Sequence, residues 1–144
     1  VKARLNILVS GGTGAGKTTL ISALSTFIPK EERNMIGDVR DEDVRAILRN
    51  EKKGLDGFLA KGHSSSPSNM IDRLEIIAYL EGMNLPIKAI REQIARTVDI
   101  IVHLSRFNDG TRKITKITEV QGIEGENIAL RDIFVVNPPE GSYY

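Results

Sequence analysis

The 144-residue sequence contains no cysteine and no tryptophan, and aromatic residues make up only 5% of it. Without cysteine, neither a disulfide framework nor a thiolate metal site is possible. The scarcity of aromatic rings argues against a surface on which nucleic-acid bases stack. The formal net charge is only +1, so no strong field of one sign draws the protein to nucleic acid or to a membrane.

Long hydrophobic runs are also missing. No apolar stretch is long enough to cross a bilayer, and no signal peptide is visible. Hydrophobic residues make up 40% and charged residues 27%, which is ordinary for a soluble globular protein with a real core. We therefore expect one domain over residues 1–144 and a cytoplasmic location. The chain begins with Val1 rather than Met, so we expect a fragment or a processed product.

What the sequence does contain is a glycine-rich motif, G-x-x-x-x-G-K-[ST], over residues 11–18. An apolar run precedes it and a helical pattern follows, which is the context that a phosphate-binding loop requires. Glycines let successive N–H groups turn toward an anion, and the following helix adds its own N–H groups. The alternative is a glycine-rich turn without a binding function. A chain of this length contains the motif by chance with a probability of about 1%. The residues predicted to bind ATP are Gly11, Gly12, Thr13, Gly14, Ala15, Gly16, Lys17, Thr18 and Thr19.

Two side chains in this motif have specific predicted roles. Lys17 is expected to reach the β- and γ-phosphates and to stabilise charge on the transferring phosphoryl group, which makes it a catalytic residue. The Thr18 hydroxyl is expected to ligate Mg²⁺. The sequence thus predicts ATP and Mg²⁺ as cofactors.

Four helices are expected. The first ends near Phe27 or Ile28, before Pro29, and faces inward with five residues: Leu20, Ile21, Leu24, Phe27 and Ile28. The others are a charged helix over 41–53, one from the Ser66 cap to about Glu81, and one that opens at Pro86. The helix after Pro86 is expected to face inward with Ile87, Ile90 and Ile94.

Strands are expected over the apolar run before the glycine motif and over residues 34–39, 99–104, 112–120 and 128–136. Turns are expected at 108–110 and 122–126, a loop at 54–68, and a tail at about 137–144. The predicted fold class is α/β, with a RecA-like P-loop NTPase core followed by a C-terminal antiparallel β-meander. Phosphate chemistry is expected at the carboxyl end of the first strand.

Several segments together resemble the secretion-type ATPases, and most closely the CpaF-like branch of tight-adherence (Flp) pili, related to the type II and type IV secretion motors. The segments that carry the resemblance are residues 6–19, 37–40, 54–57, 63–67, 87–95, 98–103, 109–112, 117–120 and 130–134. The resemblance implies an ATP-hydrolysing motor domain that works as a hexamer. It also implies a position at the inner face of the bacterial inner membrane, where such motors act on platform proteins without crossing the bilayer.

The resemblance implies roles for two further residues. Asp38, in the segment Gly37-Asp-Val-Arg40, stands where the family has glutamate, and would hold Mg²⁺ through water with support from Arg40; alternatively, it caps a turn. His63 matches the second histidine of the family's histidine box, whereas Leu55 replaces the first. His63 would sense the γ-phosphate or shuttle a proton, or else be a solvated loop residue. His103, inside an apolar run, is expected to be buried and hydrogen-bonded.

The departures from the family keep other functions open. Family members have roughly forty more residues before the position of Asn34, including an acidic box that positions the attacking water. A nucleotide-binding assembly module, or an incomplete copy with little or no hydrolysis, is therefore the alternative. A small P-loop kinase is a third, for which no arginine-rich lid or acceptor site is visible. The scattered basic residues are expected to be solubilising, with contact to a neighbouring subunit or to adenine as the alternative: Lys2, Arg4, Arg112, Lys113 and Lys116.

Overall fold

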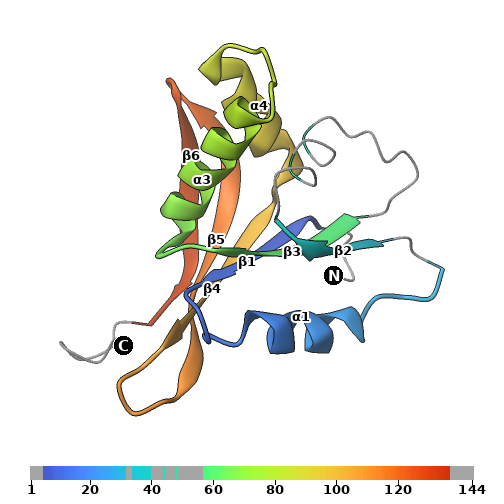
Figure 1. Ribbon diagram of the computed structural model, residues 1–144, viewed down its shortest axis with the longest axis vertical. Coiled ribbons are helices and arrows are strands. Elements are labelled where there is room, and N and C mark those ends of the chain that lie inside the picture. Colours follow the sequence, from blue (N-terminus) through green and yellow to red (C-terminus); the bar gives the residue numbers. More distant parts are fainter. Residues whose placement is uncertain (1–4, 32–33, 40–43, 45–47, 49–56, 137–144) are drawn as a thin grey trace.

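The computed structural model describes residues 5–31, 34–39, 44, 48 and 57–136. These residues form one six-stranded sheet with helices on both faces (Figure 1). In chain order the elements are β1 (Ile7–Gly11), α1 (Lys17–Ser25), β2 (Asn34–Asp38), β3 (Gly57–His63), α3 (Pro67–Leu80), α4 (Ile87–Thr97), β4 (Ile100–Arg106), β5 (Arg112–Glu124) and β6 (Asn127–Val135). The predictions for Arg40, Leu55 and the tail at 137–144 lie outside the described residues, as does most of the helix predicted over 41–53.

The sheet has a parallel half and an antiparallel half, in the order β2-β3-β1-β4-β5-β6. The first four strands in this order run parallel, with β1 between β3 and β4. The last two pairings are antiparallel, so β4, β5 and β6 form a meander. The mixed α/β architecture and the C-terminal meander are therefore confirmed.

Strand β3 is the main correction to the predicted elements, because residues 54–68 were expected to form a loop. Its residues Phe58, Leu59 and Ala60 are almost fully buried, and it pairs with both β1 and β2. The strand ends in Lys61-Gly62-His63, and lysine and glycine are disfavoured in strands, so its strand character is hidden in the sequence. Backbone hydrogen bonds to its two parallel neighbours, β1 and β2, stabilise the strand even though its local propensity is low.

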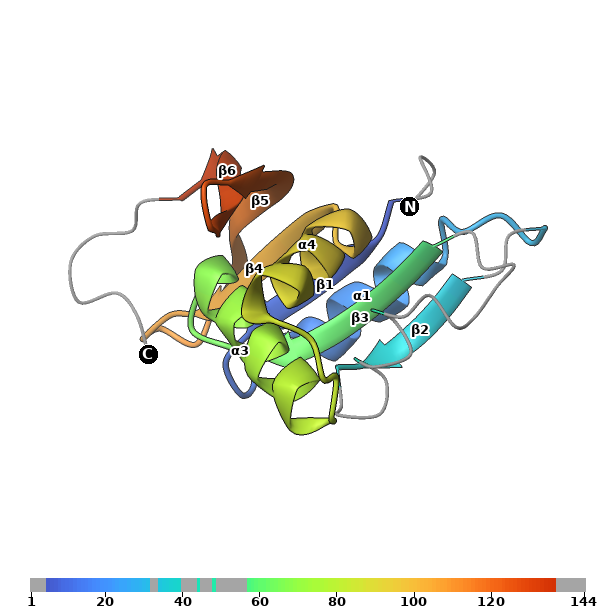
Figure 2. The same cartoon turned by 90° about the horizontal axis from the view of Figure 1, so that it is seen from above.

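Helices α3 and α4 cover one face of the sheet and α1 covers the other (Figures 1 and 2). On the face of α3 and α4, Leu8 of β1 packs in one cluster with Met70 and Ile90. On the opposite face, Val9 packs with Ile21 of α1. Fully burying each such side chain stabilises the fold by about 1.5–3 kcal/mol. The two apolar faces of β1 thus hold the strand and its following loop between the helical layers.

Two helices differ in detail from expectation. Helix α1 ends at Ser25, where the N–H groups of Thr26 and Phe27 bond three residues back, to the carbonyl groups of Ala23 and Leu24. Phe27 is 56% exposed, so its predicted place on the inward face is wrong, and within α1 only Ile21 is buried. Ile87 is the first residue of α4 and is 47% exposed, so it does not face inward as predicted.

The predicted start of α3 is confirmed. The Ser66 side chain accepts a hydrogen bond of 3.0 Å from the backbone N–H of Asn69, and Pro67 occupies the first helical position. The N-cap oxygen and the proline together account for N–H groups that the helix could not pair internally. The inward residues predicted for this helix are all buried: Met70, Leu74, Ile77 and Ala78.

The turn at 108–110 is confirmed, with Gly110 at φ +85° and its N–H bonded to the carbonyl of Phe107. The second turn, predicted over 122–126, is confirmed only at its last two residues, Gly125-Glu126. Gly122 instead lies inside β5 at a shift in the pairing register, where its φ of +117° favours glycine. Within the part of the chain that the structure describes, no helix combines the length and the apolar character needed to span a membrane.

Candidate functional site

The glycine loop, residues 12–16, joins the carboxyl end of β1 to the start of α1. Gly14 has φ +73° and Gly16 has φ +98°, a region in which residues with a Cβ are strained. Gly11 is required for a different reason, because a Cβ there would lie 2.7 Å from the carbonyl oxygen of Leu104 on β4. Helix α1 begins immediately after Gly16 without a side-chain cap, so its N-terminal dipole faces the loop. This arrangement is suited to an anion.

Lys17 turns back over the loop. Its Nζ donates hydrogen bonds of 3.0 Å to the carbonyl oxygen of Gly11 and 2.7 Å to that of Gly12. Burial lowers the pKa of the Lys17 ammonium, and the nearby charge of Lys61 lowers it further, whereas Asp38 acts in the opposite direction. The predicted phosphate-binding cation is therefore held at the loop, close to a second cation and a carboxylate.

That second cation, Lys61, joins the two residues predicted to hold the metal. Its Nζ donates a 2.6 Å hydrogen bond to Oγ1 of Thr18 and lies 3.3 Å from Oδ1 of Asp38. Asp38 on β2 and Lys61 on β3 are register partners, and Thr18 lies in the first turn of α1. The structure thus brings Lys17, Thr18 and Asp38 together as predicted, around a lysine that the sequence reasoning missed.

The geometry of this cluster does not fit a divalent ion in its present arrangement. Mg²⁺ requires near-octahedral oxygen ligands, and in proteins it is usually held by one or two carboxylates together with phosphates. The hydroxyl of Thr18 and the carboxylate of Asp38 are suitable donors, but both contact the ammonium of Lys61. Among the described residues, no group of three or more His, Cys, Asp or Glu side chains could hold a metal ion.

A cavity of about 410 Å³ opens beside the glycine loop, at the carboxyl ends of β1, β3 and β4. Its lining is Gly12, Thr13, Ala15, His63, Ser64, Ser65, His103, Leu104, Ser105 and Arg106. His63 ends β3 here, is exposed, and accepts a 2.9 Å hydrogen bond at its carbonyl oxygen from Nη1 of Arg73. The structure therefore places His63 beside the loop, while its role in phosphate sensing or proton transfer stays a prediction.

His103 also lines this cavity, although it is only 6% exposed. Its Nδ1 lies 2.7 Å from Oγ of Ser10, its partner in register on β1. Burial lowers the pKa of His103, and the charges of Lys116 and Lys17 lower it further. The prediction of a buried, hydrogen-bonded histidine is confirmed.

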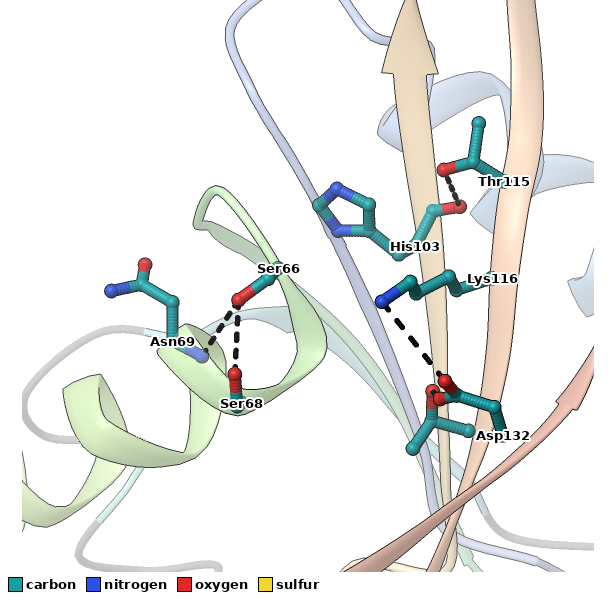
Figure 3. A network of polar contacts seen from close by, with 8 residues as sticks. Ser66, Ser68, Asn69, His103, Thr115, Lys116 and Asp132 are labelled. Atoms are coloured by element: carbon teal, nitrogen blue, oxygen red, sulfur yellow. Dashed lines mark hydrogen bonds and ion pairs between the residues drawn. The ribbon is translucent and has the colours of Figure 1, made fainter. Parts of the chain in front are cut away.

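On the α3 side, the ring of His103 faces the start of that helix (Figure 3). A second hollow of about 290 Å³ lies there, lined in part by Ser66, His103 and Lys116. Lys116 Nζ is 4.0 Å from Oδ2 of Asp132 on β6, and Asp132 Oδ1 accepts a 2.8 Å hydrogen bond from Thr118. Lys116, Thr118 and Asp132 thus pair with one another beside this hollow.

Two arginines of the β4–β5 hairpin border the glycine loop. A Cβ at Gly14 would lie 3.6 Å from Nη1 of Arg106, and a Cβ at Gly16 would lie 3.6 Å from Cδ of Arg112. Arg112 is exposed, as expected of a solubilising residue, yet its aliphatic part lies over the loop. The sequence did not lead us to predict a role for Arg106. Its position at the end of a strand beside β1 could have indicated one, because polar residues at the ends of such strands converge on a site.

The fold is shared with a known secretion ATPase. The VirB11 ATPase of the Brucella suis type IV secretion system superposes with a TM-score of 0.69 at 21% identity, over 81% of this chain and 48% of that one. The family model described as "Type II/IV secretion system protein" matches residues 1–36, which include β1, the glycine loop and α1.

Two curated relatives are similar over most of this chain. A Mycobacterium tuberculosis protein named for conjugal transfer is 25% identical over 174 residues, covering 87% of this chain and 49% of the relative. The conjugal transfer protein TrbB of Rhizobium radiobacter is 24% identical over 167 residues, covering 85% and 50%. The chain thus spans about half the length of the curated relatives it matches.

Proposed function

We propose that this chain is the ATP-binding core of a secretion-system ATPase. The observation that carries the proposal is the glycine loop, in which two glycines with positive φ lead into an uncapped helix that begins with Lys17. A polyphosphate chain fits such a loop because it meets backbone N–H groups, a helix N-terminus and an ammonium at once. The shared fold and the family match over residues 1–36 support the same reading.

In this proposal the residues have distinct roles. The N–H groups of residues 12–16 and of the first turn of α1 surround the phosphates. Lys17 exchanges its hydrogen bonds with Gly11 and Gly12 for phosphate oxygens and stabilises charge at the γ-phosphoryl group. Arg106 adds a guanidinium at the cavity wall beside Gly14. The sequence predicts magnesium at Thr18 and Asp38, but both side chains contact the ammonium of Lys61, so no role is assigned to the metal in this proposal.

The biological setting follows from the resemblance. We propose that the complete protein forms a hexamer, works in the cytoplasm at the inner face of the inner membrane, and moves platform proteins by closing one subunit against the next. The names of the relatives favour conjugal transfer or another type IV system. The narrower resemblance to the CpaF-like pilus branch stays a prediction, because the relatives described above carry other names.

One observation favours the alternative, an assembly module that binds ATP and hydrolyses it poorly. Among the described residues that line the cavity beside the loop, none is an aspartate or a glutamate. Hydrolysis needs a group that orients or deprotonates the attacking water, and His63 is an exposed candidate among the described residues that line the cavity.

A binding titration tests the main proposal. A fluorescent ATP analogue should bind the wild-type chain, and Lys17→Ala should weaken binding at least about tenfold, because a charge-assisted contact to phosphate is lost. Lys88→Ala, an exposed lysine on α4, is the matched control and should bind as wild type does. Equal affinity in all three chains, or no binding at all, contradicts nucleotide binding at the loop.

Hydrolysis is measured separately as release of inorganic phosphate. Turnover that Lys17→Ala abolishes supports the motor. Tight binding with turnover no faster than that of Lys17→Ala supports the assembly module instead, and transfer of the phosphoryl group to a small acceptor would indicate a kinase.

A further inference from the structure

Lys61 lies where a metal ion would otherwise be expected. Its ammonium contacts both oxygen atoms that the sequence assigns to magnesium, 2.6 Å from Thr18 Oγ1 and 3.3 Å from Asp38 Oδ1. These are distances of direct contact, so a divalent ion and this ammonium cannot occupy the position between the two oxygens together.

The fold builds this contact from three separate elements. Lys61 and Asp38 face each other across neighbouring parallel strands, β3 and β2. Because side chains alternate along a strand, Lys61 shares the face of Leu59, which packs in the same cluster as Ile21 of α1. Thr18 lies in the first turn of α1, on that same face. The ammonium is therefore directed at the start of the helix that follows the glycine loop.

The ammonium of Lys61 has room for a further partner. It has three N–H groups, one of which bonds to Thr18, and it forms an ion pair with Asp38. The side chain of Lys61 is 28% exposed, so it can be reached from solvent. Lys17 is close enough that the charge of Lys61 affects it. Two lysine cations at the head of one helix, with one carboxylate, leave a net positive charge that a phosphate oxygen would balance.

We propose that Lys61 is a built-in cation that takes the place of Mg²⁺ in this chain. The β- and γ-phosphates are neutralised by Lys17 and Lys61, with Lys61 held in position by Thr18 and Asp38, so nucleotide binds without a divalent metal. This inference rests on the proposed nucleotide binding at the glycine loop. In this arrangement Lys61 contacts phosphate, and Asp38 is the residue that positions Lys61.

The experiment is a titration of the full chain with a fluorescent ATP analogue, once in EDTA and once in excess MgCl₂. The wild-type chain should bind in EDTA at least as tightly as in MgCl₂, because excess Mg²⁺ occupies the β- and γ-phosphate oxygens that Lys17 and Lys61 would otherwise contact. Lys61→Thr removes the cation and leaves both oxygens accessible. In EDTA it should bind at least about tenfold more weakly than wild type, and MgCl₂ should restore much of that loss.

A second readout reports the metal directly. Mn²⁺, followed by electron paramagnetic resonance in the presence of nucleotide, should give a protein-bound signal with Lys61→Thr and none beyond the free Mn²⁺–nucleotide complex with wild type. Lys61→Arg, which keeps the charge, should retain binding in EDTA. Lys88→Thr is the matched control for the loss of one lysine, and circular dichroism checks that each variant is folded.

The outcomes separate this inference from the one it rests on. Wild-type binding that requires MgCl₂, with Lys61→Thr behaving as wild type, overturns the role of Lys61 while nucleotide binding stands. A bound Mn²⁺ signal in wild type overturns it as well. Absence of nucleotide binding in both buffers, for wild type and every variant, contradicts the proposed function and this inference with it.

Discussion

The hydroxyl oxygen of Ser10 on β1 lies 2.7 Å from Nδ1 of His103 on β4, in the buried part of the sheet beside the glycine loop. The two residues are 93 positions apart in the chain and are register partners in a parallel pair. The contact ties the strand that carries the loop to the strand that ends in Arg106. Its energy should depend on the protonation state of the imidazole.

Stability is therefore expected to fall in mild acid. Because the pKa of folded His103 is depressed below the ordinary value of 6.5, the unfolded chain binds a proton that the folded chain resists. The contribution of the neutral imidazole is fully present above about pH 6.5 and is lost as the pH falls through that value toward the folded pKa.

Urea unfolding at pH 7.5 and pH 5.5 measures this loss. Wild type should lose more unfolding free energy between the two pH values than His103→Gln does. His63→Gln, at an exposed position, is the matched control and should lose as much as wild type. An equal loss in wild type and His103→Gln would contradict the linkage.

Gly62 is expected to be essential for packing under α3. A Cβ at this position would lie 2.7 Å from Cε and 2.9 Å from Sδ of Met70, which is fully buried. Gly62→Ala should lower the unfolding free energy by about 1 kcal/mol, the low end of the range for overpacking, because the atoms it meets are the flexible end of Met70. Gly12→Ala, where a Cβ meets nothing within 4 Å, is the comparison, and chemical denaturation of both variants gives the answer. A stability of Gly62→Ala equal to that of Gly12→Ala would show that Met70 moves aside freely.

Ser66 is expected to stabilise α3 through its cap. Ser66→Ala removes the acceptor for the Asn69 N–H and should reduce stability by about 1 kcal/mol. Ser68→Ala is the matched control, since Ser68 is exposed and its hydroxyl lies 3.2 Å from Ser66 Oγ, without accepting a backbone N–H bond from the described residues. Thermal unfolding of the two variants should differ by several degrees; coincident transitions would argue against the cap.

Arg106 is expected to contribute to nucleotide affinity if the proposed function holds. Its guanidinium lies beside Gly14 at the cavity wall, where it can contact phosphate oxygens. Arg106→Ala should weaken binding of an ATP analogue by about tenfold, the effect of losing one charge-assisted hydrogen bond. Arg96→Ala, at an exposed position in the last turn of α4, should leave the affinity unchanged. A titration in which both variants match wild type removes Arg106 from the site.

The parts of the fold that the sequence predicts well are those in which a local pattern suffices. The run before Gly11, the glycines and the helical period after Lys17 are contiguous, so strand β1, the loop and helix α1 follow from one stretch of chain. The start of α3 is likewise local, because a serine cap and a proline act within one turn. The hairpin turn at Gly110 needs only a glycine that can adopt positive φ.

The errors concern residues whose state depends on distant neighbours. Strand β3 was predicted as a loop because its strand character comes from β1 and β2 on either side. Phe27 was predicted to face inward because it is apolar and lies at helical spacing. Helix α1 ends at Ser25, before Phe27, so the helical face does not extend that far. Helical periodicity identifies a face, but only packing decides how far along the helix that face is covered.

The glycine loop can be predicted from the sequence, because the conformations it needs are properties of glycine and of the strand and helix directly beside it. The surroundings of that loop depend on tertiary packing. Lys61 reaches Thr18 and Asp38 only because parallel pairing sets β3 beside β2 and α1 packs on that face. Asp38 and Lys61 lie 20 and 43 residues after Thr18 along the chain, yet the ammonium of Lys61 contacts both Thr18 Oγ1 and Asp38 Oδ1, and no local pattern encodes that meeting.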